Sequence, residues 1–231
     1  GNGYSGHLYV HEKFGTPFLY MNSETDPNNF FSLHVRTPQK DDTGISHMLE
    51  HLSLRGSQKY PINRLFFELN KRSYSTFMNA FTAPEYTCFP FSSTNKVDFM
   101  NILDVYLDCV FHPNFSEIEF LSECHHYMFE DNDPNKELKH GGIIYNEMCG
   151  EYADPQTVYG HEMTRALYPD SATRFDTGGR PEEIPKATYE RVKKHHEKYY
   201  NPVNAFFFFY GSFPVEEVFQ KVSEVIDPID V

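Results

Sequence analysis

The pentapeptide His47-Met48-Leu49-Glu50-His51, which has the pattern H-x-x-E-H, decides how this sequence is interpreted. Residues four positions apart lie on the same face of a helix, so His47 and His51 can both direct a ring nitrogen at one metal ion. Glu50 would lie beside that ion, where its carboxylate can take a proton from a bound water molecule. The spacing therefore predicts a metal site with a general base next to it.

The residues around this motif favour a helix. Thr43 is a candidate N-cap, and Gly56 is a candidate for the residue that follows the helix. Apolar residues recur between them at helical spacing, namely Ile45, Met48, Leu49 and Leu52. Five residues alone also fit a partly exposed helix with two structural histidines, but their order is that of the inverted zincins.

Longer stretches carry a family resemblance. Residues 42–51 (DTGISHMLEH), followed by residues 56–61 (GSQKYP), resemble the presequence-protease branch of the pitrilysin-like metallopeptidases, to which falcilysin-type enzymes also belong. Further matching stretches follow in order: STFMNAFT at 75–82, YT at 86–87, PFS at 90–92, YNEMCG at 145–150, NAFF at 204–207 and YG at 210–211. The resemblance extends from about residue 28 to the C-terminal helix.

Two histidines do not complete a catalytic zinc site, which takes three protein ligands and keeps one position open. Spacing alone leaves the third ligand open among the acidic residues on expected helices, which are Glu119, Glu123, Glu130, Glu147 and Glu151. The resemblance implies Glu147, because Asn146-Glu147-Met148 matches the third-ligand motif of the family. It thus implies one zinc ion per chain, held by His47, His51 and Glu147, with Glu50 as the general base.

Residues 75–82 carry two interpretations. In the family this stretch is similar to the edge strand that binds substrate, and the small Ala80 beside Asn79 would let a peptide backbone approach closely. An ordinary sheet strand is the alternative. Arg55 follows the metal-binding helix, where we expect an exposed charge at the helix end, with contact to an acidic substrate group as the alternative.

Hydropathy patterns predict an α+β domain with helices packed on a mainly antiparallel sheet. The expected strands cover residues 7–12, 16–21, 30–37, 75–82, 85–90 and 203–210, and the four phenylalanines at 206–209 predict burial of the last strand on both faces. Besides the metal-binding helix, the expected helices cover residues 63–72, 97–111, 116–130, 142–153, 156–167, 185–200 and 215–226. Ser116 with Glu119 is a capping box, and Pro185 suits the first turn of its helix.

The composition excludes some function classes. A formal net charge of −13 argues against nucleic acid as a partner, because its phosphates would be repelled. No apolar run is long enough to span a membrane. The four cysteines show no C-x-x-C spacing, so we expect free, buried thiols of a reducing compartment. The histidine pairs 125–126 and 195–196 cannot chelate one ion well, and we expect them on the surface.

The length of 231 residues suits one domain. The family resemblance implies a larger protein, built from two halves that close into a chamber, in which the second half completes the active site. We therefore expect residues 1–231 to be a single N-terminal zinc-binding peptidase domain, with the remaining domains and a peptide substrate as partners. Because the first residue is Gly1, either an upstream segment was removed or an expression scar precedes Asn2.

The function implied by the resemblance is a zinc metalloendopeptidase that cleaves short unstructured peptides, such as targeting peptides. The isolated domain should bind zinc with little or no activity. The resemblance also implies an organelle, the mitochondrial matrix first, with a plastid-type organelle or the cytoplasm left open. Two alternatives are a catalytically silent structural or assembly subunit of the same fold, and a zinc-dependent binding module without turnover. The complete ligand set and Glu50 speak against both.

Overall fold

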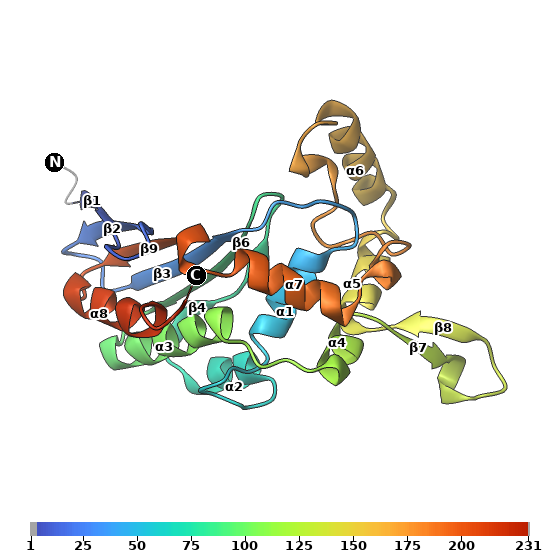
Figure 1. The fold of residues 1–231 in the computed structure, drawn as a ribbon, viewed down its shortest axis with the longest axis horizontal. Coiled ribbons are helices and arrows are strands. Elements are labelled where there is room, and N and C mark those ends of the chain that lie inside the picture. Colours follow the sequence, from blue (N-terminus) through green and yellow to red (C-terminus); the bar gives the residue numbers. More distant parts are fainter. Residues whose placement is uncertain (1–3, 231) are drawn as a thin grey trace.

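The computed structural model describes residues 4–230, which form an α+β fold as predicted (Figure 1). The strands are β1 (Tyr4–Val10), β2 (Pro17–Ser23), β3 (Asn29–Arg36), β4 (Ser75–Met78), β5 (Phe81–Thr82), β6 (Tyr86–Ser93), β7 (His126–Phe129), β8 (Leu138–Gly141) and β9 (Ala205–Gly211). The helices are α1 (Ile45–Ser53), α2 (Leu65–Arg72), α3 (Lys96–Phe111), α4 (Glu117–Glu123), α5 (Ile143–Glu151), α6 (Pro155–Leu167), α7 (Tyr189–Tyr199) and α8 (Val215–Ile226). Within residues 4–230, no helix is both long and apolar enough to cross a membrane.

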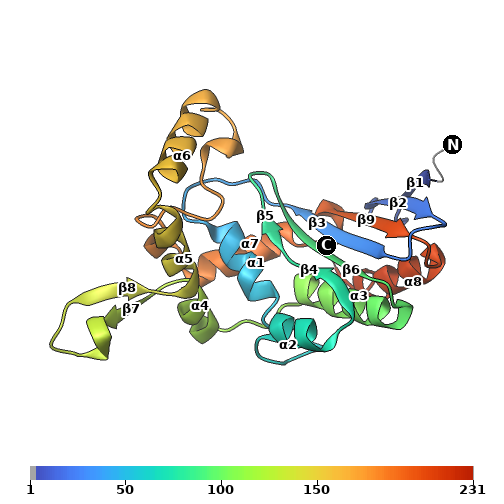
Figure 2. The ribbon, with the colours of Figure 1, turned by 180° about the vertical axis from the view of Figure 1, so that it is seen from behind.

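One mixed sheet forms the body of the molecule, with the strand order β1-β2-β9-β3-β6-β4 and the short β5 also paired to β6. All neighbouring strands are antiparallel except β2 and β9, which run parallel. Helices α3 and α8 cover one face (Figure 1), and the view from behind shows β4 and β5 at the edge near α1 (Figure 2). Helix α1, which carries the predicted ligands His47 and His51, therefore lies beside β4 and β5 at the edge of the described sheet.

The core between the sheet and its helices is rich in aromatic side chains. Phe91 lies with its ring centroid 5.0 Å from that of Phe99 and 5.2 Å from that of Tyr106, and all three are buried. Each fully buried side chain of this size contributes about 1.5–3 kcal/mol to the stability of the fold. The predicted apolar face of α3 is buried throughout, at Phe99, Ile102, Leu103, Tyr106, Leu107 and Val110.

Two predictions for the sheet and its surroundings are wrong. Strand β9 is buried on alternate residues: Phe207 and Phe209 are in the core, whereas Phe206 and Phe208 are half-buried on the other face. Helix α4 has the predicted capping box at Ser116 but ends at Glu123 instead of near residue 130. It ends there because the carbonyl oxygens of Leu121 and Cys124 accept hydrogen bonds from the His126 ring and the Tyr145 amide.

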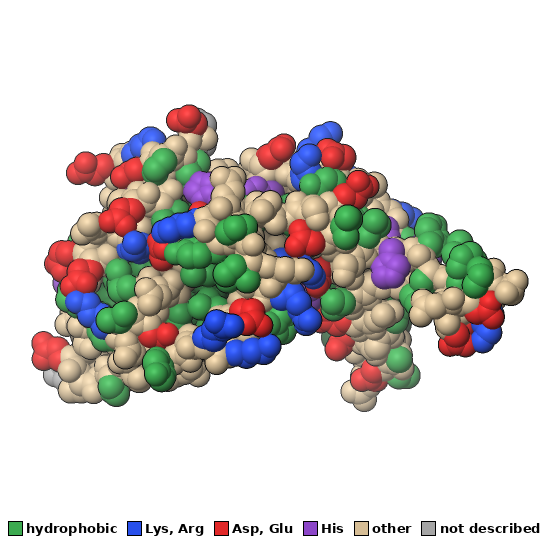
Figure 3. Space-filling view, turned by 90° about the horizontal axis from the view of Figure 1, so that it is seen from below, with side chains coloured by type: hydrophobic (Ala, Val, Ile, Leu, Met, Phe, Trp, Pro, Cys, Tyr) green, Lys and Arg blue, Asp and Glu red, His purple; other side chains and the backbone are tan. Residues whose placement is uncertain are grey.

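The chain after α4 forms a projecting hairpin where the sequence predicts the rest of a helix and a loop. Strands β7 and β8 pair from His126 with Gly141 to Phe129 with Leu138. Figure 3 shows hydrophobic side chains gathered on this projection, where Tyr127, Phe129 and Leu138 are exposed. Helix α7 also differs, since it begins at Tyr189, capped by the Thr188 hydroxyl, while Pro185 lies in a separate 3₁₀ turn.

Both ends of α1 differ from the expected caps. Gly44, in the left-handed conformation with φ 71°, is the N-cap, while Thr43 donates its N–H and hydroxyl to Asp41. A Cβ at Gly44 would lie 2.8 Å from the carbonyl carbon of Gly178 and 2.9 Å from Cα of Gly179. The helix already ends at Ser53, before Gly56. The start of α1 is therefore fixed by close backbone contact with the loop between α6 and α7.

We expect Gly44→Ala to lower the free energy of unfolding by about 2 kcal/mol or more, because alanine there is strained and collides with main-chain atoms. Gly160→Ala is the matched control. Gly160 lies within α6 with no atom near the added methyl group, so alanine should raise the stability by about 0.5–1 kcal/mol. Urea unfolding of both variants measures this. Equal effects of the two substitutions would contradict the described packing at Gly44.

Candidate metal centre

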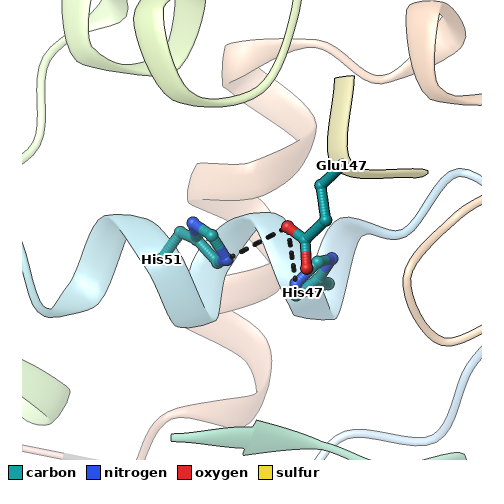
Figure 4. A group of neighbouring side chains, drawn as sticks. All are labelled: His47, His51 and Glu147. Atoms are coloured by element: carbon teal, nitrogen blue, oxygen red, sulfur yellow. Dashed lines mark ion pairs between the residues drawn. The ribbon is translucent and has the colours of Figure 1, made fainter. Parts of the chain in front are cut away.

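Three predicted ligands meet in the structure. His47 and His51 extend from α1 and Glu147 from α5, and Figure 4 shows the carboxylate directed between the two rings. Oε2 of Glu147 lies 3.9 Å from Nε2 of each histidine. The ligand atoms of these three side chains all lie within 4.8 Å of one another, which is close enough for them to hold one metal ion. Among residues 4–230, no other group of three histidine, cysteine or acidic side chains meets this condition.

The second nitrogen of each ring is held by an acceptor. Nδ1 of His47 lies 3.3 Å from the carbonyl oxygen of Gly178, and Nδ1 of His51 lies 3.4 Å from Oε2 of Glu123. An acceptor at Nδ1 places the ring proton there and leaves the lone pair on Nε2. Both rings therefore present Nε2, in the form that binds a metal, to the same point beside Glu147.

The three side chains fit a divalent metal such as zinc. Two imidazole nitrogens and one carboxylate oxygen are a donor set of catalytic zinc sites. The separation of 3.9 Å between each Nε2 and Oε2 is less than twice a zinc–ligand bond of about 2.1 Å. The group opens on a cavity of about 470 Å³, which leaves room for a further ligand.

Glu123 and Arg55 lie next to the cluster, in contacts that the sequence does not predict. Glu123 is buried, accepts from His51 and forms an ion pair with Arg55, whose Nε lies 3.6 Å from Glu119. The side chain of Arg55 is only 13% exposed, so the expectation of an exposed charge at the helix end is wrong. The cause is the packing of α4 against α1, which places two carboxylates around the guanidinium group.

Glu50 lies on the cavity side of α1, as the H-x-x-E-H spacing requires. Its residue exposure is 9%, and Oε2 accepts a hydrogen bond of 2.5 Å from the Thr82 hydroxyl of β5. Both residues line the cavity beside His47 and His51. Thr82 thus fixes the carboxylate in place at the edge of the site.

Asn79 and Ala80 line the same cavity at a break in the sheet edge. The predicted single strand is divided there into β4 and β5. The main chain of Asn79 is held by its N–H bond to Pro90 and by the Tyr106 hydroxyl, while its side chain accepts from the Ala80 N–H. Asn79 and Ala80 thus lie on the wall of the cavity that Glu50 also lines.

The loop between α6 and α7 contributes residues that the sequence left unassigned. Asp176 is buried and accepts hydrogen bonds from the Tyr152 hydroxyl (2.5 Å) and the Gly178 N–H (2.9 Å). Nε2 of His161 lies 3.3 Å from the same carboxylate. These contacts fix the Gly178 carbonyl that holds His47. The glycines and prolines of this loop predict its irregular structure but not these contacts.

The other candidate ligands have structural contacts elsewhere. Glu119 completes the capping box of α4, and Glu130 pairs with Lys139. Glu151 lines the cavity but lies outside the cluster.

The expectation of surface histidines is wrong for His125, His195 and His196, which are half-buried. His125 lies 2.9 Å from the Ala187 carbonyl and His196 3.0 Å from that of Val110, and burial lowers the pKa of His195 to about 4. The cysteines are free; Cys88, Cys109 and Cys124 are buried as predicted, and Cys149 is half-buried.

Curated proteins similar to this chain include presequence proteases. Presequence protease 1 of Arabidopsis thaliana, named as chloroplastic/mitochondrial, is 41% identical over 95% of the chain and 20% of its own length. The mitochondrial presequence protease of Xenopus laevis is 44% identical over 93% of the chain and 21% of its length. Protein HypA of Clostridium perfringens is 40% identical over 95% of the chain and 22% of its length. The chain thus spans about a fifth of these relatives.

Family profiles and a solved structure agree with this similarity. A protease from Helicobacter pylori has the same fold, with a TM-score of 0.79 over 98% of this chain and 51% of its own, at 18% identity. The profile of Insulinase (Peptidase family M16) matches residues 36–141, and that of the Peptidase M16 inactive domain matches residues 186–230. By these matches together, the chain belongs to peptidase family M16.

Proposed function

We propose that this chain is the zinc-binding domain of a metalloendopeptidase that hydrolyses peptide bonds in short, unstructured peptides. The observation that carries the proposal is the convergence of His47, His51 and Glu147 on one point, with Glu50 beside it in an open cavity. Membership of a peptidase family and the similarity to presequence proteases support it.

Glu50 would act as general base. When bound, zinc supplies Lewis-acid chemistry, since it polarises a carbonyl group and lowers the pKa of water toward about 7. The carboxylate of Glu50 takes the proton of the attacking water and later delivers it to the leaving amine. Its hydrogen bond with Thr82 keeps one oxygen in place, which leaves the other for this proton transfer.

The substrate would bind along the edge formed by β4 and β5. An extended peptide can add to a free strand edge through main-chain hydrogen bonds. Asn79 and Ala80 lie where such a peptide would pass Glu50, and the small Ala80 side chain permits close approach. Recognition through the main chain requires an unfolded segment, which suits targeting peptides and similar fragments. These are the substrates that we propose.

We further propose that residues 1–231 are an N-terminal domain whose remaining domains complete the active site. The support is that the similar presequence proteases are about five times as long as the matched region. The isolated chain would then bind zinc with little turnover. For location we propose an organelle, the mitochondrial matrix first, on the names of the Arabidopsis and Xenopus relatives. Because HypA of Clostridium perfringens has a comparable identity, the cytoplasm stays the alternative location.

The silent-subunit alternative is not favoured. The inactive-domain profile matches residues 186–230, which carry none of the four proposed site residues. Those residues lie on α1 and α5, where the donor set is complete.

Replacing Glu50 tests the general base. We expect Glu50→Gln to lower kcat/KM of the enzyme assembled with its remaining domains by about 10²–10⁴-fold, because the amide cannot accept the proton. Zinc content should stay that of the wild type, since Glu50 is not a proposed ligand. The measurement is cleavage of a fluorogenic unstructured peptide, with zinc determined on the same sample. A variant that retains most of the activity would refute the assignment.

Replacing Glu147 tests the third ligand in the chain itself. We expect Glu147→Gln to weaken zinc binding strongly, because a neutral amide replaces the charged donor. Glu151→Gln is the matched control, as Glu151 lines the same cavity outside the cluster and should leave the affinity unchanged. Competition titration with a zinc-binding dye measures both. Equal affinities of the two variants would contradict the ligand assignment.

Replacing Glu123 tests the residue behind His51. We expect Glu123→Gln to lower zinc affinity by about 10–100-fold, because the ring loses its charged acceptor and the guanidinium of Arg55 loses a partner. Glu119→Gln changes the same charge next to Arg55 without touching His51 and serves as control. Titration with zinc, together with thermal unfolding of the metal-free variants, separates ligand orientation from general destabilisation. An equal loss in both variants would show that Glu123 acts only through Arg55.

A further inference from the structure

One histidine of the cavity beside the metal centre is not part of the proposed zinc site. His161 of α6 lines this cavity together with His47 and Glu50, but it lies outside the ligand cluster. Figure 2 shows α5 and α6 on one side of α1, with β4 and β5 on the other. The proposed substrate strands thus form one wall of the cavity, and α5, α6 and residues 176–178 form the wall across from them.

The ring of His161 is held in two ways. Its Nε2 lies 3.3 Å from Oδ2 of the buried Asp176. Its plane is stacked on the ring of Tyr152, with the centroids 5.5 Å apart and an angle of 8° between the planes. The Tyr152 hydroxyl donates to the same Oδ2 at 2.5 Å. A side chain whose position is already fixed loses little conformational entropy when it contacts a ligand.

The carboxylate of Asp176 also determines which ring nitrogen of His161 is left as an acceptor. An ionised carboxylate only accepts, so Nε2 carries the proton, and in the neutral ring the lone pair lies on Nδ1. Within residues 4–230, no hydrogen bond to this Nδ1 is found, and it is not among the side-chain atoms that are buried without a partner. Nδ1 is therefore an accessible acceptor on a residue that lines the cavity.

An extended peptide bound along β4 and β5 requires acceptors on the other wall. The N–H groups of successive residues in a strand point alternately to its two sides. Half of them can pair with the edge strands, while the other half are directed toward α5, α6 and residues 176–178. A main-chain N–H that leaves water without finding an acceptor costs as much free energy as a lost hydrogen bond.

Few acceptors on that wall are available for such a peptide. Glu147 is the proposed third ligand, the Gly178 carbonyl holds His47, and Asp176 already accepts from several donors. His161 and Glu151 remain. The exposed Glu151 side chain has no partner within residues 4–230 that would hold it, whereas the His161 ring is fixed by Asp176 and Tyr152.

We propose that Nδ1 of His161 accepts a hydrogen bond from a main-chain N–H of the peptide substrate, on the side of the peptide that faces away from β4 and β5. This inference rests on the proposed function, since it takes the cavity as the peptide site. Contact with the main chain, and not with a side chain, suits unstructured peptides of varied sequence.

Short peptide hydroxamates test this proposal on the zinc-loaded chain, since a hydroxamate binds zinc and no turnover is needed. Each main-chain N–H is removed in turn by N-methylation, and Kd is measured by calorimetry. We expect one methylation to weaken binding to the wild type about fivefold and to have no such effect on His161→Phe. The other methylations should have equal effects in both proteins, so the comparison isolates this one contact. His7→Phe, an exposed histidine of β1, is the control and should behave as the wild type.

Nitrogen NMR of the histidine rings gives a second test in the wild-type chain, which does not depend on how a variant folds. We expect His161 in the form with the proton on Nε2, and we expect the ¹⁵N resonance of Nδ1 to shift when the unmethylated peptide binds. A proton on Nδ1, or the same effect of every methylation in wild type and His161→Phe, would overturn this inference alone. Failure of every hydroxamate to bind the zinc-loaded wild type would contradict the proposed function as well.

Discussion

The hydrogen bonds at Nδ1 of His47 and His51 are the constraint on which the candidate metal centre depends. A histidine on a helix can rotate its ring and move its proton, so the H-x-x-E-H spacing alone does not direct two Nε2 lone pairs to one point. The Gly178 carbonyl and the Glu123 carboxylate remove that freedom. Both acceptors come from segments far from α1 in the sequence.

Each acceptor is itself held in place by the fold. The carboxylate of Asp176 accepts a hydrogen bond from the Gly178 N–H and so fixes this loop. The carboxylate of Asp42 accepts from the Asp176 N–H at 2.8 Å, which connects the loop to the start of α1. Glu123 is fixed by its ion pair with Arg55. The close fit of Gly44 against the same loop explains why a residue without a side chain begins the helix. The contacts that pack this loop and α4 against α1 are therefore the same contacts that orient the two histidine rings.

Periodic segments were predictable from the sequence, because local patterns determine them. The α+β class, the buried face of α3 and helix α8 at 215–226 agree with the prediction. The sequence predicts too long a helix α4, because the end of this helix depends on hydrogen bonds from His126 and Tyr145 that no local pattern shows. The H-x-x-E-H spacing alone predicts that His47 and His51 share a metal ion, whereas only the family resemblance identifies Glu147 as the third ligand. Glu123 was indistinguishable from other helical carboxylates until the fold placed it behind His51.

Zinc K-edge X-ray absorption of the zinc-loaded chain tests the central claim most directly. Coordination by His47, His51 and Glu147 predicts two imidazole rings and oxygen donors at about 2.0–2.2 Å, without sulfur. The His51→Ala variant should lose one imidazole contribution, if it retains zinc at all. Sulfur scattering at about 2.3 Å, or an unchanged spectrum in the variant, would contradict the account.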